Sequence, residues 1–139
     1  MADTIEPPGA TGYVLCDDMI FTSRITGTAL ALGLKMKPAR SLDVLQTLIA
    51  QQRPSCLVVD LANPSLDLVG LLGFLKESGP TMPRVIAYGS HVDSATLKAA
   101  REAGCDVVLP RSKFVEELPQ ALPEWMGVQP GGRDVSPSV

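Results

Sequence analysis

The sequence has 139 residues, of which 45% are hydrophobic and 19% are charged, and its formal net charge is −3. A domain typically has roughly 100–200 residues, so this length predicts one globular domain, and the apolar content excludes a disordered chain. An acidic chain with 4% aromatic residues lacks both the basic surface and the stacking aromatic side chains of nucleic-acid-binding proteins, so we expect no nucleic-acid partner.

The cysteines and the N-terminal residues indicate a cytoplasmic protein. No apolar stretch approaches the ~20 residues needed to cross a bilayer, so we expect no membrane contact. The first residues lack the cationic and apolar regions of a secretory signal. The three cysteines contain no CxxC pair, which favours reduced thiols in a core over disulfides or zinc ligands; they are Cys16, Cys56 and Cys105.

Short apolar runs predict five buried strands. Continuous apolar or β-branched runs of this kind are typical of strands covered on both faces. In chain order the expected strands are 13–16, 35–39, 56–60, 85–88 and 107–109. Pro38 cannot donate a hydrogen bond to a neighbouring strand, so we expect the second strand to lie at the edge of the sheet.

A helical pattern follows each predicted strand. Ser41 and Asp93 are suited to cap the second and fourth helices. The fifth helix is expected to start near Ser112 and to be kinked or shortened by Pro119 and Pro123. The faces that we expect to be buried are Phe21, Ile25, Ala29 and Leu32; Leu42, Leu45, Leu48 and Ile49; Leu68, Leu71, Leu72 and Leu75; and Leu97, Ala100 and Ala103.

The alternation of strands and helices predicts an α/β fold, a doubly wound parallel sheet with helices on both faces. We expect one domain at residues 12–126. The segments 1–11 and 127–139 are rich in Pro, Gly or Ser and are expected to be flexible tails. Ligands of such sheets bind beyond the carboxyl ends of the strands, which is where functional side chains should be sought.

Three acids stand at those strand ends. Asp17 and Asp18 follow the first strand, and Asp60 ends the third. Three carboxylates in one crevice repel one another unless a cation lies between them, and Mg²⁺ prefers such oxygen ligands. A carboxylate can also act as the nucleophile that forms an aspartyl-phosphate. Taken singly, each acid is equally consistent with a solvated loop residue.

The chain resembles the receiver domain of two-component response regulators over residues 12–118. The segment 14–18 is similar to the family's opening strand with its acidic pair. The segment 60–67 is similar to the phosphoacceptor segment, with a proline four residues and an acid seven residues after the acceptor. The segment 103–106 matches the Ala-Gly-Ala-Asp run before the fifth strand. This resemblance implies a flavodoxin-like five-stranded sheet of order 2-1-3-4-5.

The resemblance also implies a site. Asp60 would accept a phosphoryl group from a histidine kinase or a phosphotransfer protein. Asp17, Asp18, Asp60 and the backbone carbonyl of Ala62 would hold Mg²⁺. Such a site works by positioning and by charge neutralisation.

The sequence departs from the family at the positions that respond to phosphorylation in its members. Gly89 stands at the place of a Thr or Ser whose hydroxyl binds the phosphoryl group, although a shift of one residue would put Ser90 there. Arg111 replaces a phosphoryl-contacting lysine, which is not a conservative exchange. Val108 replaces a rotating aromatic residue, and Met19 stands where a third acid often follows the pair. The resemblance is therefore to an atypical, pseudo-receiver variant.

Three functions follow from these observations. The first is a signalling receiver that is phosphorylated at Asp60 and acts by binding a downstream protein. The alternative is a pseudo-receiver that is not phosphorylated and serves as a constitutive interaction or dimerisation module. A small enzyme ranks behind both, because no glycine-rich phosphate loop or nucleophile–base pair is present. The role of His91, the only histidine, stays open.

Protein contacts are expected on the surface of the fourth helix, fifth strand and fifth helix. The family's use of this surface implies contact residues at Leu97, Arg101, Val108, Arg111 and Phe114. This expectation rests on the fold family alone.

Overall fold

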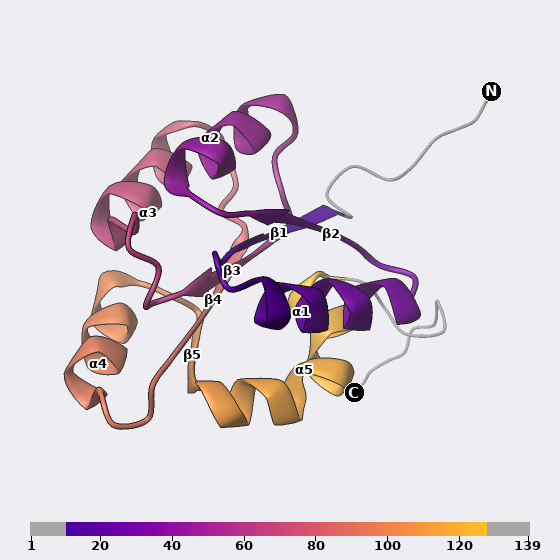
Figure 1. Ribbon diagram of the computed structural model, residues 1–139. Coiled ribbons are helices and arrows are strands. Elements are labelled where there is room, and N and C mark those ends of the chain that lie inside the picture. The colour runs from indigo at the N-terminus through magenta and orange to yellow at the C-terminus, as the bar shows by residue number, and fades with distance from the viewer. Residues whose placement is uncertain (1–10, 128–139) are drawn as a thin grey trace, which may run out of the picture.

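The computed structural model describes residues 11–127, in which strands and helices alternate strictly (Figure 1). The strands are β1 (Thr11–Leu15), β2 (Lys35–Ala39), β3 (Cys56–Asp60), β4 (Arg84–Gly89) and β5 (Val107–Pro110). The helices are α1 (Met19–Ala31), α2 (Leu42–Gln51), α3 (Leu68–Glu77), α4 (Ser94–Ala103) and α5 (Arg111–Trp125). Within this range no helix is long and apolar enough to cross a membrane.

The five strands form one parallel sheet of order β2-β1-β3-β4-β5. This confirms the predicted doubly wound sheet and the strand order that the resemblance implied. β2 pairs only with β1, so Pro38 lies in an edge strand as expected. The central strand β3 pairs with β1 on one side and β4 on the other, in a register that sets Asp60 beside Tyr88.

The helices form two layers over the sheet. α1 and α5 pack on one face, and α2, α3 and α4 pack on the other (Figure 1). Successive strand side chains point to opposite faces. Tyr13 and Leu15 therefore lie in the core under α2, α3 and α4, whereas Val14 and Cys16 lie in the core under α1 and α5. The alternation decides which layer each side chain near the strand ends can reach.

The ends of several elements differ from the sequence-based expectation. β1 begins at Thr11, inside the expected tail, because Thr11 pairs in register with Lys35 of β2 and its carbonyl accepts from the Ser55 N–H at 2.9 Å. Residues 1–10 and 128–139 of the expected tails lie outside the described residues. Leu32 is the C-cap of α1 and is exposed rather than buried. The expected caps Ser41 and Asp93 are confirmed.

Helix α5 runs through both prolines that were expected to kink or shorten it. Pro119 and Pro123 both lie inside it, and the helix is not shortened by either. A proline removes one N–H donor and bends a helix, and the ribbon of α5 changes direction between its orange and yellow parts (Figure 1). The buried residues Phe114, Leu118 and Leu122 anchor it on the sheet across these interruptions.

The three thiols are free. Cys16 and Cys56 are buried, whereas Cys105 is only half-buried, so the prediction of three core cysteines is wrong for one of them. Burial raises the pKa of Cys56 to about 12 and that of Cys105 to about 11. Both therefore stay protonated at neutral pH.

Arg53 ties the loop before β3 to the end of α3. Its guanidinium donates to the carbonyl of Leu75 at 2.7 Å, to the carbonyl of Thr81 at 2.7 Å and to the Ser78 hydroxyl at 2.8 Å. We expect Arg53→Ala to lower the free energy of unfolding by about 1–3 kcal/mol, because hydrogen bonds to a charged donor are lost and carbonyls lose their partner.

Urea denaturation measures this loss. Arg53→Lys is expected to recover little of it, because an ammonium cannot match the planar fork. Arg40→Ala, which removes an exposed side chain from another loop, is the control and should change stability by less than about 0.5 kcal/mol. Equal losses in Arg53→Ala and Arg40→Ala would contradict the assignment.

Candidate functional site

The predicted acids lie at one edge of the sheet. Asp60 is the last residue of β3, and Asp17 and Asp18 come directly after β1. β1 and β3 are neighbouring parallel strands with Leu15 opposite Val59, so their carboxyl ends meet. The structure thus brings the three acidic positions to the edge where ligands of this class of sheet bind.

Asp60 is buried, with 6% of its surface exposed, and its two carboxylate oxygens have different partners. Oδ1 accepts from the N–H of Ala62 at 2.9 Å. Oδ2 accepts from the thiol of Cys16 at 3.6 Å, a weak donor. The carboxylate is therefore oriented by one strong and one weak hydrogen bond, and the bond to Oδ2 is the easier one to break.

The turn after Asp60 is held by a buried amide. Asn63 donates its backbone N–H to the Asp60 carbonyl at 3.0 Å and its side-chain amide to the Arg40 carbonyl at 3.1 Å. Its Oδ1 accepts from the hydroxyl of Ser65 at 2.6 Å and from that residue's N–H at 2.9 Å. This network fixes the loop that carries Ala62 beside Asp60.

Asp17 and Asp18 are both exposed. Asp18 caps α1, with its Oδ1 accepting from the N–H of Phe21 at 3.1 Å, which leaves its second oxygen for another ligand. Across residues 11–127 no group of three or more His, Cys, Asp or Glu side chains is gathered closely enough to hold a metal ion. The donor chemistry suits Mg²⁺, but the three carboxylates are not drawn together in this structure.

The expected phosphoryl-contacting residues gather around a small cavity beside Asp60. Gly89, Ser90 and Arg111 line a space of about 70 Å³ together with Ala62. Gly89 is the last residue of β4 and follows the partner of Asp60 in the sheet. Because glycine has no side chain, no hydroxyl projects from this position; a Cβ there would lie 3.4 Å from the side chains of Leu61 and Leu97, an ordinary contact distance.

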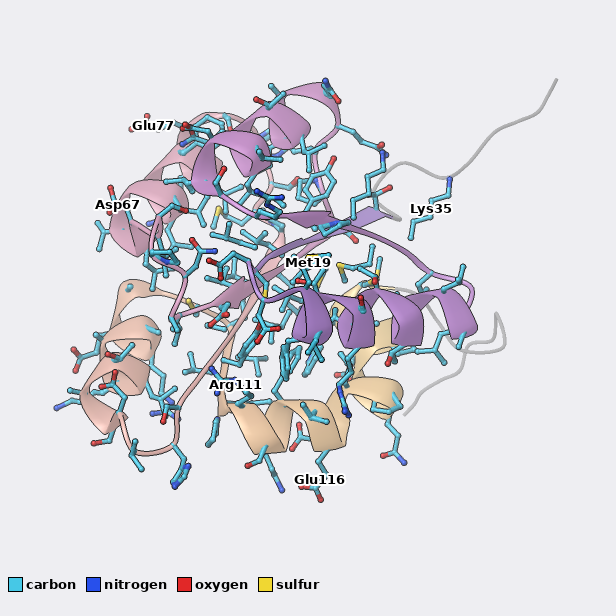
Figure 2. All side chains as sticks on the ribbon, viewed as in Figure 1. Met19, Lys35, Asp67, Glu77, Arg111 and Glu116 are labelled. Carbon is cyan, nitrogen blue, oxygen red and sulfur yellow. The ribbon has the colours of Figure 1, made fainter. Side chains whose placement is uncertain are left out.

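Arg111 begins α5 and faces α1. Its guanidinium lies 5.8 Å from the centroid of the Phe21 ring, within cation–π distance. In Figure 2, Met19 and Arg111 mark the first turns of α1 and α5, which lie on the same side of the sheet. A wider hollow of about 620 Å³ separates these turns, and it is lined by Ile20, Phe21, Arg24, Ser90, His91, Arg111, Ser112 and Val115.

Two residues near Asp60 were not predicted as site residues. Tyr88 points into the layer of α1 and α5, where its ring stacks on Phe114 at 4.6 Å between centroids. Cys16, expected only as a core residue, donates to Asp60. The available signal was position: each directly precedes a predicted site residue, and strand alternation places both on the same face.

Three of the five residues expected to contact a partner are buried in this structure. Leu97, Val108 and Phe114 are 5%, 7% and 0% exposed, because they pack against the sheet and form part of its two cores. Arg101 is exposed and donates to the carbonyl of Val108 at 3.4 Å. Arg101 and Arg111 are thus the members of the predicted set that a partner can reach.

Another hollow, of about 520 Å³, lies at the opposite edge of the sheet. It is lined in part by Met82, Pro83, Arg84 and Trp125, near the amino ends of β3 and β4. None of the predicted site residues lines it, so we place the candidate site at the end of β3, where Ala62, Gly89 and Arg111 line the smaller cavity.

The fold is shared with solved receiver domains. NtrX from Brucella abortus matches with a TM-score of 0.73 and 19% identity; the match covers 86% of this chain and 27% of that chain. A response regulator receiver domain from Francisella matches at 0.71 and 20% identity, covering 85% and 97% of the two chains. A signal receiver domain from Bermanella marisrubri matches at 0.72 and 19% identity, covering 84% and 98%.

These likenesses establish the receiver fold for this chain. The chain spans about a quarter of the NtrX molecule. No protein-family model and no curated protein matches the sequence.

Proposed function

We propose that this chain is an atypical receiver module of two-component signalling that accepts a phosphoryl group at Asp60 and acts by binding another protein. The observation that carries the proposal is the position of Asp60: it ends β3 beside the acids that follow β1, in the receiver fold. A histidine kinase or a phosphotransfer protein is the expected donor. The catalytic role is limited to chemistry on its own carboxylate.

The residues around Asp60 suit this reaction. An oxygen of the Asp60 carboxylate attacks phosphorus, and the bond from phosphorus to the donor breaks with its electron pair leaving on the donor. The Ala62 N–H holds Oδ1 in place, so the Oδ2 side, held only by a thiol, is the better nucleophile. Arg111 lines the small cavity at the end of β3, as Ala62 does, and supplies positive charge for the transferred group.

Mg²⁺ belongs to this proposal as a cofactor. Asp17, Asp18, Asp60 and the Ala62 carbonyl would hold it, and the ion would neutralise charge on the transferred group. Asp18 can take part with the oxygen that does not cap α1. Because the carboxylates are not yet gathered, we expect weak binding that depends on both strand ends.

A second candidate function is supported by the missing hydroxyl at Gly89 and by Val108. Val108 is a small buried aliphatic residue where a receiver's switch carries an aromatic ring. Without either group the usual route from Asp60 to the α4–β5–α5 surface is absent, and a ligand cannot shift an equilibrium with no second state. The chain would then serve as a constitutive interaction or dimerisation module.

Amide NMR separates the two functions. We expect Mg²⁺ followed by beryllofluoride, an analogue of the phosphoryl group, to shift the amide signals of Asp17, Asp18, Asp60 and Arg111. Asp60→Asn should abolish the shifts. Asp18→Asn retains an N-cap of similar quality and should weaken the Mg²⁺ response without unfolding α1. An unchanged wild-type spectrum would contradict phosphorylation at Asp60 and support the constitutive module.

A further inference from the structure

The Tyr88 hydroxyl is buried without a hydrogen-bond partner. The side chain is 0% exposed, and among residues 11–127 its hydroxyl is the one buried side-chain N or O atom for which no partner is found. Buried polar groups are nearly always paired, and each exception calls for an explanation. A buried hydroxyl without a partner destabilises the free protein, and it can form a hydrogen bond when a ligand brings an acceptor within reach.

The surroundings of this hydroxyl place it at the candidate site. Burial raises the pKa of the Tyr88 phenol well above its ordinary value, the Cys16 thiol and the Asp60 carboxylate raise it further, and the Arg111 guanidinium lowers it. Tyr88 is also the residue paired with Asp60 in the sheet. The Cys16 thiol acts on the Tyr88 phenol, but the hydroxyl makes no hydrogen bond of acceptable geometry; the thiol lies 3.6 Å from both Asp60 Oδ2 and the Asp18 carbonyl oxygen.

On the other side of β4, Gly89 offers no hydroxyl. Its α-carbon faces the side chains of Leu61 and Leu97, so the cavity wall there is apolar. Successive strand residues point to opposite faces, so the Tyr88 side chain lies in the α1 and α5 layer, on the side of β4 away from the one that Gly89 faces. On the α1 and α5 side, the Tyr88 hydroxyl is thus a donor without a partner, while position 89 itself supplies no donor on the other side.

We propose that Tyr88 is a positioning residue whose hydroxyl donates to Asp60 only when that side chain is phosphorylated or bound to a phosphoryl analogue, in place of the hydroxyl that Gly89 lacks. The inference rests on the proposed function. When Oδ2 bonds to phosphorus, Oδ1 becomes a carbonyl oxygen that keeps the Ala62 N–H. The transferred group brings new acceptor oxygens to the Oδ2 side, which is the side of the Cys16 thiol that neighbours Tyr88. Tyr88 keeps its proton throughout, so no proton transfer accompanies the step.

The ring of Tyr88 provides a way to observe this bond. It stacks on Phe114 at 4.6 Å, and Phe114 stacks on Trp125 at 5.8 Å between centroids. Trp125 is the only tryptophan of the sequence and is buried in the same core. A shift of the Tyr88 ring is therefore expected to change the emission of Trp125 on α5.

Tyr88→Phe removes the hydroxyl and keeps the stacked ring. With Mg²⁺ present, we expect the beryllofluoride concentration at half-saturation to rise about five- to tenfold, which is what one hydrogen bond made only in the bound state is worth. Amide NMR measures the saturation, and Trp125 emission follows it. In the absence of beryllofluoride, thermal stability should be unchanged or higher, because the lost hydroxyl had no partner.

Tyr13→Phe is the matched control, since these are the only two tyrosines. The Tyr13 hydroxyl donates to the carbonyls of Gln52 at 2.6 Å and Leu48 at 3.1 Å. Its loss should lower stability and leave beryllofluoride binding unchanged.

Each outcome decides between the two proposals. Equal saturation in wild type and Tyr88→Phe would overturn the role of Tyr88 while leaving Asp60 as acceptor. A clear loss of stability in Tyr88→Phe without beryllofluoride would overturn it too, because the hydroxyl would already be bonded. A wild type that does not respond to beryllofluoride would overturn the proposed function and this inference together.

Discussion

Asp60→Asn is expected to abolish covalent phosphorylation of this chain by a small acyl phosphate in the presence of Mg²⁺. An amide is not a nucleophile of comparable strength, and the other acids do not share the position of Asp60 at the end of β3. Asparagine has the same shape and can still accept from the Ala62 N–H, so the fold should be retained. Intact-mass spectrometry detects the added phosphate, and hydroxylamine should remove it because it is an acyl phosphate.

The control for this result lies in the same segment. Asp67 is exposed and caps α3, accepting from the Gly70 N–H at 3.1 Å, and Figure 2 shows it at the start of that helix. Asp67→Asn keeps a good cap and should be phosphorylated like the wild type. Phosphate on Asp60→Asn, or its loss in Asp67→Asn, would show that the acceptor is misassigned. An unlabelled wild type would favour the constitutive interaction module.

The architecture could be predicted from the sequence because every level of the pattern agreed. Apolar runs such as 56–60 and caps such as Ser41 and Asp93 all indicated the same alternation. The boundaries were less predictable. Thr11 carries no apolar signal, and it joins β1 because the backbone of β2 is there to pair with it.

The helix after β5 shows where local rules give way to packing. Pro119 and Pro123 each disfavour a continuous helix, yet α5 reaches Trp125. The apolar residues Phe114, Leu118 and Leu122 bury one stripe of the helix on the sheet. That burial outweighs the loss of two N–H donors, and propensity alone could not have shown it.

The position of the acidic residues could be predicted from the sequence, but the side chains that surround them could not. Strand ends located Asp60 and its acidic neighbours, because the carboxyl edge of a parallel sheet is a property of the topology. The position of the Tyr88 hydroxyl beside Asp60 depends on the register of β3 with β4, which pairs these two residues. The sequence alone does not specify that register. The burial of three predicted contact residues has a similar cause: an apolar residue such as Leu97 fits both a core and a partner surface until the packing is known.

Phe114→Ala is expected to lower the free energy of unfolding by about 3–5 kcal/mol, the cost of truncating a buried aromatic side chain. Phe114 is 0% exposed and its ring lies between those of Tyr88 and Trp125. Urea denaturation followed by circular dichroism gives the free energy, and an unchanged m-value would show that the change lies in stability.

Two variants show what this loss depends on. Phe114→Leu keeps most of the volume and should cost clearly less than Phe114→Ala. Phe74→Ala truncates a half-buried phenylalanine on α3, in the other helix layer, and should also cost less because water already reaches that ring. Equal losses at Phe74 and Phe114 would contradict a central role for the stack. Because the stack adjoins both Asp60 and α5, a destabilising change at Phe114 should also reduce any response of Trp125 to a ligand at Asp60, whereas Phe74→Ala should leave that response intact.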